Sequence, residues 1–497
     1  MAPSTDPVPL RHPPSADQLR RRSRELQRRV RAGDAQAQDL ITRLVPGTKT
    51  GPDFPLHLAQ LAVARGHGFA SWPRLAQYVE LVAGLTHHPV PDPDETADPV
   101  EQFVGSAVLR YDGNDSGARP VRAAQMLDAH PDLPTRSLAA AVVAADHGAV
   151  ERFLTADPEA ARRPAGPLGW EPLLYLCYGR LDRPAADVIT TAGLLLRSGA
   201  DPNAGFLWNG LVPPFTALTG ILGNGEQGPQ ALPPHPHELL LARLLLEAGA
   251  DPNDGQAVYN RMFAADDSHL ELLLAYGFGA GDGGPWRRRM PEVLPTPNEL
   301  AAQQLGWAAA HGMDHRVRLL APLVDLAAPI RTPWTPAMAA TELAMITGHP
   351  QTARLLTELG APAPADPAAA LIQALLTGDR RTVDTLSAAD PQLLEQVRRQ
   401  RPSLMLRAAV AEHLAGAKLL VDKGFDVNAM GRSDLPIEQP WHTALHYAAS
   451  IGNLELIRTL LELGADPDIP DAHYRTTPAV WAEHFGHDAA AQLLRAR

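Results

Sequence analysis

Cysteine, aromatic residues and long apolar runs are all scarce in this sequence. Cys177 is the single cysteine among 497 residues, which excludes an internal disulfide framework and a cysteine-rich zinc site. No window approaches about 18 uninterrupted apolar residues, and residues 1–14 lack the apolar core of a secretory signal. The sequence therefore predicts neither a membrane-spanning helix nor an export signal, and we expect the chain in the cytoplasm.

Catalytic and cofactor-binding motifs are also missing. There is no Gly-x-Ser-x-Gly, no phosphate-binding Gly-x-x-x-x-Gly-Lys loop and no dinucleotide fingerprint. Cys177 lies in the apolar stretch 172–179, where a thiol is usually a small core residue. We predict no catalytic residue and no cofactor. The alternative is an enzyme or a substrate-binding subunit that holds a peptide or small molecule in a groove, because scattered acidic and histidine side chains escape local motifs.

Composition favours closely packed helices. Apolar residues make up 45% of the chain but aromatic residues only 5%, so Ala and Leu supply most of the core. Small residues and Leu suit helices that pack closely on one another. The 48 prolines and 39 glycines recur between short apolar segments, where they end helices. The length predicts several domains or one extended repeat array.

Charge is unevenly distributed along the chain. Residues 1–31 carry eight Arg against three acidic residues, a net charge of +5, so the remaining 466 residues carry −17. An acidic body repels phosphates, which makes nucleic acid an unfavourable partner and a basic partner a suitable one. We expect the Arg-rich helix at 19–31 to dock on the acidic body, with contact to nucleic acid or to an anionic membrane surface as alternatives.

Three segments repeat almost the same sequence. Each joins a Leu-rich helix end to Gly-Ala-Asp-Pro, at 194-LLLRSGADPNAG-205, 244-LLLEAGADPNDG-255 and 459-TLLELGADPDIP-470. The Leu spacing predicts a face that packs on a neighbouring helix, and the Gly suits the left-handed position that ends a helix. Asp-Pro and Asp-x-Asn then favour a turn. Longer connections are predicted at 223–237 and 281–298.

A second motif follows these turns. It reads 442-HTALHYAASIGN-453 and 476-TTPAVWAEHFGH-487, with Gly452 and Gly486 34 residues apart. With the Gly-Ala-Asp turn it resembles the ankyrin repeat family, most closely from 443-TALHYAA-449 through 460-LLELGADPD-468. The resemblance implies an all-α solenoid of about eleven units over 100–497, with short turn or β-finger connections. It also implies a non-enzymatic scaffold that binds a protein or peptide along a concave face and finger edge.

The N-terminal region differs from the repeats. We expect a disordered tail at 1–18, a helical module at 19–85 and an exposed linker at 86–99. Leu19, Ser23, Leu26 and Val30 share one helical face. Residues 54–82 are similar to a small helical module that often precedes ankyrin arrays in bacterial proteins, which implies no known chemistry.

Tryptophans concentrate between a turn and the next helix, where ankyrin repeats have their fingers. Interfaces favour tryptophan, so these rings and their neighbours are the predicted partner-binding residues, although each ring would equally serve to stiffen adjacent fingers. The predicted set is Trp170, Phe206, Trp208, Trp286, Arg287, Arg288, Trp334, Trp441, Tyr474 and Arg475.

Histidine spacing also raises a metal hypothesis. His442 and His446 are four residues apart, and His484 and His487 three, so each pair shares a helical face. However, His446 stands at the family's ordinary Leu-His position and no third ligand follows at a suitable spacing. The sequence therefore predicts no metal site.

Overall fold

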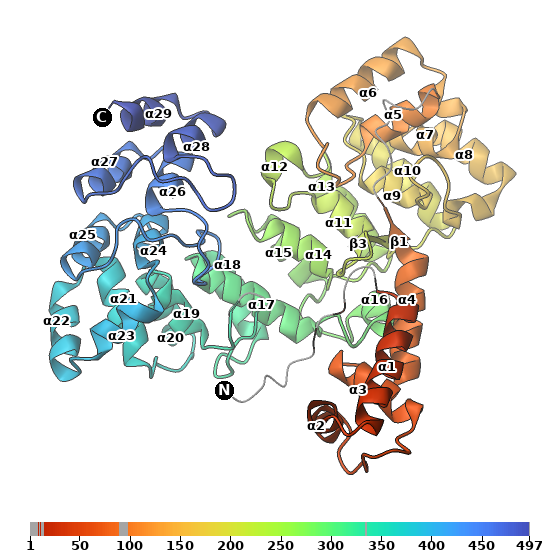
Figure 1. Cartoon of the computed structure of the whole chain (residues 1–497). Coiled ribbons are helices and arrows are strands. Elements are labelled where there is room, and N and C mark those ends of the chain that lie inside the picture. Colours follow the sequence, from red (N-terminus) through yellow and green to blue (C-terminus); the bar gives the residue numbers. More distant parts are fainter. Residues whose placement is uncertain (1–7, 9, 11–13, 89–97, 333–334, 497) are drawn as a thin grey trace. The chain divides into compact units, whose positions relative to one another are not determined.

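The computed structural model describes residues 8, 10, 14–88, 98–332 and 335–496. The chain divides into two compact units, Met1–Pro297 and Asn298–Arg497. Red to green elements in Figure 1 belong to the first unit, and the later green to blue elements belong to the second. Each unit is described by itself.

Unit 1 begins with four helices, α1 (Ala16–Arg31), α2 (Ala35–Leu44), α3 (Leu56–Gly66) and α4 (Trp72–Leu85). The side chain of Ser15 caps α1 by accepting a hydrogen bond from the Gln18 amide. The buried face of α1 contains the four residues that the sequence places together, namely Leu19, Ser23, Leu26 and Val30.

The arginines of α1 find partners near their own helix. Arg29 pairs with Asp34 at 2.8 Å, and Arg31 donates to the Phe54 carbonyl at 2.9 Å. Arg22 contacts the His67 ring at 3.2 Å. These contacts lie within the N-terminal region, so they give no support to the prediction that the Arg-rich helix docks on the acidic repeats.

The rest of unit 1 contains helix pairs, three short 3-10 or helical insertions and two finger strands. In chain order they are α5 (Pro99–Ala107), α6 (Ala118–Ala129), η2 (Leu133–Thr135), α7 (Leu138–Val143), α8 (His147–Ala156), η3 (Pro158–Arg162), α9 (Pro172–Cys177), α10 (Ala185–Arg197), β2 (Gly205–Trp208), β3 (Phe215–Thr216), α11 (Ala217–Leu222), α12 (Gly228–Ala231), α13 (Glu238–Glu247), α14 (Gly255–Arg261), α15 (Ser268–Ala275) and α16 (Gly284–Arg289).

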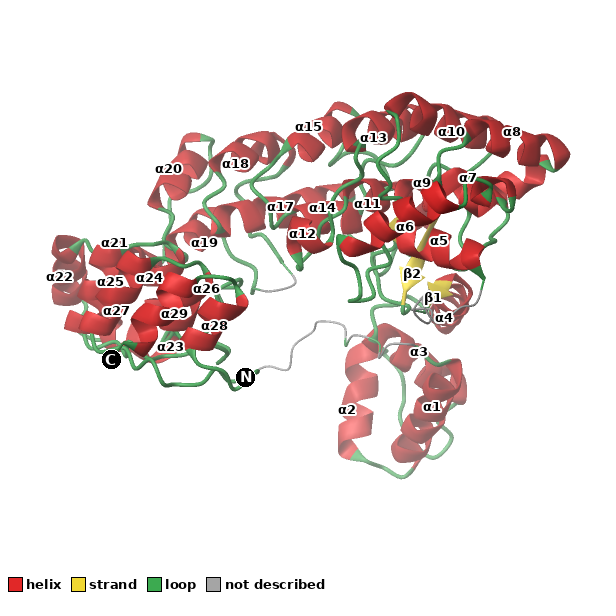
Figure 2. Cartoon of the chain, turned by 90° about the horizontal axis from the view of Figure 1, so that it is seen from above, coloured by secondary structure: helices red, strands yellow, loops and turns green. Residues whose placement is uncertain are grey.

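Helices of unit 1 form two rows. The first helices α7, α9, α11 and α14 contact one another in sequence order, and so do the second helices α8, α10, α13 and α15. Figure 2 shows the two rows side by side. Gly199 and Gly249 end α10 and α13 with φ of +90° and +99°, the left-handed backbone that the repeated Gly predicts.

A small sheet joins the N-terminal helices to the fingers. Strand β1 (Thr86–His87), which the sequence places in a linker, pairs in parallel with β2, and β2 pairs antiparallel with β3. Thr86 is opposite Leu207, and Gly205 is opposite Thr216. Leu207, Trp286 and Met290 complete the core of helices α1 to α4.

Unit 2 repeats the helix-pair arrangement. Its elements are α17 (Pro297–Ala310), α18 (Asp314–Leu320), η4 (Ala321–Leu323), α19 (Ala340–Ile346), α20 (Pro350–Glu358), α21 (Pro367–Thr377), α22 (Arg380–Ala389), α23 (Leu393–Gln400), α24 (Leu404–Val410), α25 (Leu414–Asp422), α26 (Ala444–Ser450), α27 (Leu454–Glu462), α28 (Pro478–His484) and α29 (Asp488–Arg495). First helices α19, α21, α24, α26 and α28 contact in order, as do second helices α25, α27 and α29.

The all-α fold class with short finger connections is confirmed. Fingers close by isolated antiparallel bridges, such as Ala165 with Trp170 and Gly431 with His442. The number of units, about eleven, stays a prediction. In the described part of the chain, every helix is too short or too polar to cross a membrane.

Candidate interaction site

Asparagine side chains link each repeated turn to the next. Asn203 donates to the Gly249 carbonyl at 2.9 Å and accepts from the Asp251 amide at 2.8 Å. Asn253 likewise donates to the Ala280 carbonyl at 3.1 Å and accepts from the Gly279 amide at 2.8 Å. In unit 2, Asn428 accepts from the Asp466 amide at 2.9 Å. These bonds hold neighbouring fingers in register.

The finger of unit 1 carries an aromatic cluster. Phe206 stacks on Trp170 with ring centroids 5.1 Å apart, and on Phe215 at 5.9 Å. Tyr178 packs against Trp170 at 5.0 Å. Trp170 and Phe206 are only 4% and 2% exposed, so both rings stiffen adjacent fingers in this unit.

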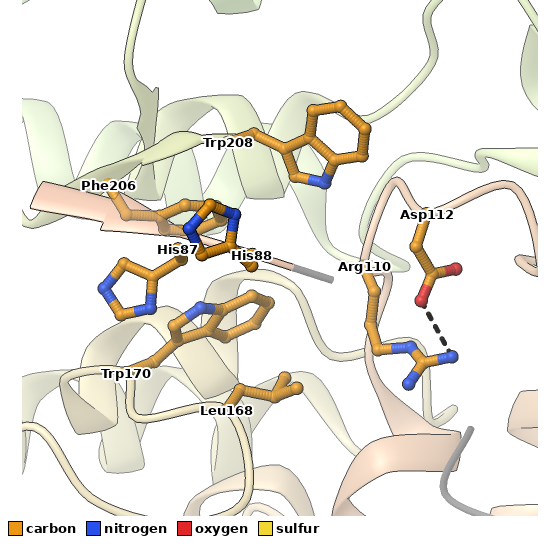
Figure 3. A pocket seen from close by; sticks show the side chains of 8 residues that line it. All are labelled: His87, His88, Arg110, Asp112, Leu168, Trp170, Phe206 and Trp208. Carbon is orange, nitrogen blue, oxygen red and sulfur yellow. Dashed lines mark ion pairs between the residues drawn. The ribbon is translucent and has the colours of Figure 1, made fainter. Parts of the chain in front are cut away.

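A recess opens beside this cluster (Figure 3). The half-buried Trp208 lies above Trp170 in that view, and a buried ion pair between Arg110 and Asp112, at 2.8 Å, closes one side. The remaining lining residues are His87, His88, Leu168 and Phe206. The free volume of about 20 Å³ suits roughly one water molecule and no larger ligand.

Strand β1 and the residue that follows it, His88, line part of this recess. The His87 ring lies 5.3 Å from the Phe206 ring, and His88 Nδ1 lies 3.0 Å from Asn209 Oδ1. Burial lowers the pKa of His87, with a hydrogen bond to Leu168 opposing that effect. The neutral imidazole therefore fits this apolar wall. Sequence motifs gave no sign of either histidine, because the pairing joins segments about 120 residues apart.

Other predicted residues of unit 1 lie elsewhere. Trp286 is 7% exposed, donates from Nε1 to the Asn203 carbonyl at 2.9 Å and has the Arg289 guanidinium 5.1 Å from its ring centroid. Arg288 pairs with Asp282 at 2.8 Å, and Arg287 is partly buried beside it. Trp334 lies outside the described residues.

In unit 2, the predicted residues form an exposed aromatic edge. The partly exposed Trp441 ring stacks on His473 at 5.0 Å, and the Arg432 guanidinium lies 4.7 Å from the Trp441 centroid. Tyr474 is 64% exposed and packs edge-on against His473 at 4.7 Å. Arg475 is exposed next to it. We call Trp441, His473, Tyr474 and Arg475 the aromatic edge.

Asp471 shapes the finger that carries this edge. Its carboxylate accepts from the amides of His473 and Thr476, at 2.8 and 3.0 Å, from the Thr476 hydroxyl at 2.6 Å and from Trp481 Nε1 at 3.2 Å. Burial would raise the pKa of Asp471, but these donors outweigh burial and hold the pKa below its usual range. The finger is thus fixed around one charged side chain.

Histidines of unit 2 serve the repeat structure. His446 contacts the Thr443 hydroxyl at 2.8 Å and the Thr476 carbonyl at 3.0 Å, and the two residues form a capping box at the start of α26. His442 is buried against Trp481. The described residues contain no group of three or more His, Cys, Asp or Glu placed to hold a metal ion. Cys177 is fully buried, which raises the pKa of its thiol.

Comparison with known proteins identifies the repeat. Residues 404–497 match the family model of ankyrin repeats (3 copies). A curated ankyrin repeat protein of fowlpox virus (strain NVSL) is 31% identical over 103 residues. The matched part is 21% of this chain and 12% of the viral protein, so this chain covers only a small part of that relative.

Proposed function

Because residues 404–497 match the family model of ankyrin repeats, we propose that this chain is a non-enzymatic scaffold that binds a protein or peptide at the aromatic edge of unit 2. The observation that carries this proposal is the exposure of Tyr474, on the finger fixed by Asp471, and the partial exposure of Trp441 on the finger before it. Rigid aromatic side chains give large contact area at little entropic cost, and binding hot spots are enriched in Trp, Tyr and Arg.

Charge around the aromatic edge favours a basic partner. The fingers 426–441 and 464–475 carry six acidic residues, Asp426, Asp434, Glu438, Asp466, Asp468 and Asp471, against Arg432 and Arg475. Five of the six are exposed, Asp471 being the buried one. An exposed tyrosine beside carboxylates suits an Arg or Lys side chain, which gains a cation–π contact as well as charge attraction.

Asp254, a buried carboxyl of unit 1 with a raised pKa, has a structural role. Burial raises the pKa of Asp254 to about 6, against hydrogen bonds from Thr216 and Thr219. The same carboxylate caps α14 by accepting from the Gln256 and Ala257 amides. A carboxylate that is enclosed by its own cap and by two threonines has no access for a substrate, so this group favours no enzymatic function.

Affinity measurement with a captured partner tests the proposal. The full chain would be immobilised, partners captured from a lysate of the source organism, and the captured protein purified for titration. We expect Trp441→Ala and Tyr474→Ala each to weaken binding roughly 30-fold, as for central interface aromatics. Phe485→Ala, which removes another exposed ring of unit 2, controls for nonspecific loss of aromatic surface.

A companion variant asks whether the unit 1 finger takes part. Trp208→Ala removes the half-buried ring of the recess without touching unit 2. Folded Trp441→Ala and Tyr474→Ala proteins with wild-type affinity would refute the aromatic edge as the binding site. Loss of affinity in Trp208→Ala alone would move the site to unit 1.

A further inference from the structure

The loop between α5 and α6, residues 108–117, lies on one face of the first-helix row of unit 1. We call this the inner face, meaning the side turned away from the second-helix row. Figure 2 shows α5 and α6 on that side of α7, α9 and α11, opposite α8 and α10. Two backbone hydrogen bonds fix the loop to the end of α9, from Leu109 to the Tyr178 carbonyl at 2.9 Å and from Arg180 to the Ala107 carbonyl at 2.8 Å.

Tyr111 extends the loop's contacts to the end of α9, to strand β3 and to helix α14. Its ring lies 5.1 Å from Phe215 and 6.3 Å from Tyr178. Its hydroxyl accepts a hydrogen bond from Asn260 Nδ2 of α14 at 3.3 Å, 149 residues away in sequence. Tyr111 has a φ of 58°, which is unfavourable for a bulky residue, so its contacts on the inner face must hold it there.

The loop is shaped by its own carboxylate. Buried Asp115 accepts from the Arg110 amide at 3.1 Å and from the Tyr111 amide at 2.7 Å, and it pairs with Arg119. These bonds hold a short loop whose one aromatic side chain, Tyr111, packs against Tyr178 and Phe215. The inner face of unit 1 thus holds a peptide that is part of the same chain.

Strand β1 fills the neighbouring finger edge in the same way. The Asn209 amide donates to the His87 carbonyl at 2.9 Å, which extends the pairing of β1 with β2. Two separate segments therefore occupy the two surfaces of unit 1, the finger edge and the inner face, that a helix-pair array offers to a peptide.

We propose that the inner face of unit 1 is a second peptide-binding surface and that loop 108–117 is its internal ligand. The external ligand is a short peptide that places an aromatic side chain against Tyr178 and Phe215 and displaces the loop. The loop lowers the apparent affinity for such a peptide, because only the open fraction of molecules binds it. This surface is independent of the aromatic edge, so each proposal can fail without the other.

A labelled peptide of the chain's own residues 105–116 is the probe. We expect full-length Tyr111→Ala and Asp115→Ala to bind it at least tenfold more tightly than wild type, because both substitutions release the loop without altering the rest of the inner face. A probe with Ala in place of its tyrosine should bind all proteins equally weakly. Tyr276→Ala removes a tyrosine at the end of α15, in the opposite row, and should match wild type.

Hydrogen exchange on the same proteins provides the second readout. The amides of Leu109 and Arg180 should exchange at least tenfold faster in both loop variants, whereas α8 and α10 keep their wild-type protection. Faster exchange without tighter probe binding would refute the second surface. Unchanged exchange in both variants would show that the loop is a fixed part of the fold, which equally refutes the proposal. A variant that loses its protection in α8 and α10 is unfolded and is set aside. The other variant then decides between the two outcomes.

Discussion

His442 is a buried imidazole whose two ring nitrogens have no hydrogen-bond partner among the described residues. It is 5% exposed and packs 4.9 Å from the Trp481 ring. Burial, and next the neighbouring His446, lower the pKa of His442 to about 4. The ring is therefore neutral in the folded protein at neutral pH, and its polar atoms are desolvated without compensation.

His442→Phe should stabilise unit 2 at neutral pH. An apolar ring of similar shape removes two unsatisfied polar atoms, so we expect a gain of about 1–2 kcal/mol in the free energy of unfolding. Chemical denaturation monitored by circular dichroism measures it. His484→Phe, at an exposed position, should change the stability little. A His442→Phe protein that is less stable than wild type would contradict the interpretation that the ring nitrogens of His442 lack hydrogen bonds.

The same substitution, His442→Phe, should make the free energy of unfolding depend less on pH between pH 6.5 and pH 4. Because the pKa of His442 is lowered from about 6.5 to about 4 on folding, the fold loses stability as the pH falls from 6.5 to 4, where the unfolded chain binds the proton first. The loss is roughly 3 kcal/mol for one such group. His349, whose pKa burial also lowers to about 4, stays in the variant, so part of the slope should remain.

Residue roles inside a repeat motif were predictable, and those outside it were not. His446 follows from the Thr-x-x-His spacing, because a cap depends on residues three apart. Exposure of Tyr474 and burial of Trp170 could not be read from similar positions between turn and helix, because burial depends on which segment covers the ring. Trp170 is covered by Tyr178, at the end of the next helix, and by Phe206 of strand β2.

Among the elements, the repeated Asp-Pro-Asn turns join fingers through their asparagines. Asn253→Ala should destabilise unit 1 by about 1–3 kcal/mol, because it leaves the Ala280 carbonyl and the Gly279 amide without this partner. Asn253→Asp keeps the acceptor and loses the donor, so it should lie between wild type and Ala. Thermal unfolding compares the three proteins. Equal stability of all three would show that the turn holds its register without the side chain.

The finger around Asp471 is a second element whose stability depends on one side chain. Asp471→Ala removes the acceptor of five hydrogen bonds and should cost about 2–4 kcal/mol, since bonds to a charged group are among the stronger ones. Hydrogen exchange should speed up at residues 472–476 before the rest of unit 2. Wild-type protection at the finger in Asp471→Ala would contradict this role.

Helix ends and turns were the predictable part of the fold at this scale, because Gly, Pro and Asn impose local backbone geometry. Strand β1 was not, since its two residues lie in a stretch with the composition of a linker. The position of α5 and α6 on the inner face could not be predicted either. The hydrogen bonds that fix their loop join Leu109 to Tyr178 and Arg180 to Ala107, residues about 70 positions apart in the sequence.

At the scale of the whole molecule, the sequence predicts one stack over 100–497, and the structure divides the chain between Pro297 and Asn298. The boundary follows the long connection predicted at 281–298. In a repeat array each unit contacts only its neighbours, so an enlarged connection weakens cooperation locally without disturbing the repeats on either side. The local pattern reveals each helix pair, but the strength of each junction depends on contacts that the pattern does not encode.

Each unit should therefore fold without the other. We expect fragments 1–297 and 298–497 each to unfold cooperatively, with melting temperatures close to those of two transitions in the full chain, by calorimetry and circular dichroism. The matched control is a cut inside unit 2. Fragment 367–497 exposes Leu371 and Leu375, both fully buried in the chain, at about 1.5–3 kcal/mol for each side chain, and loses α19, which packs on α21. It should melt at a lower temperature than 298–497. If 298–497 alone shows no cooperative transition, the two units form one folding unit and the boundary has no energetic meaning.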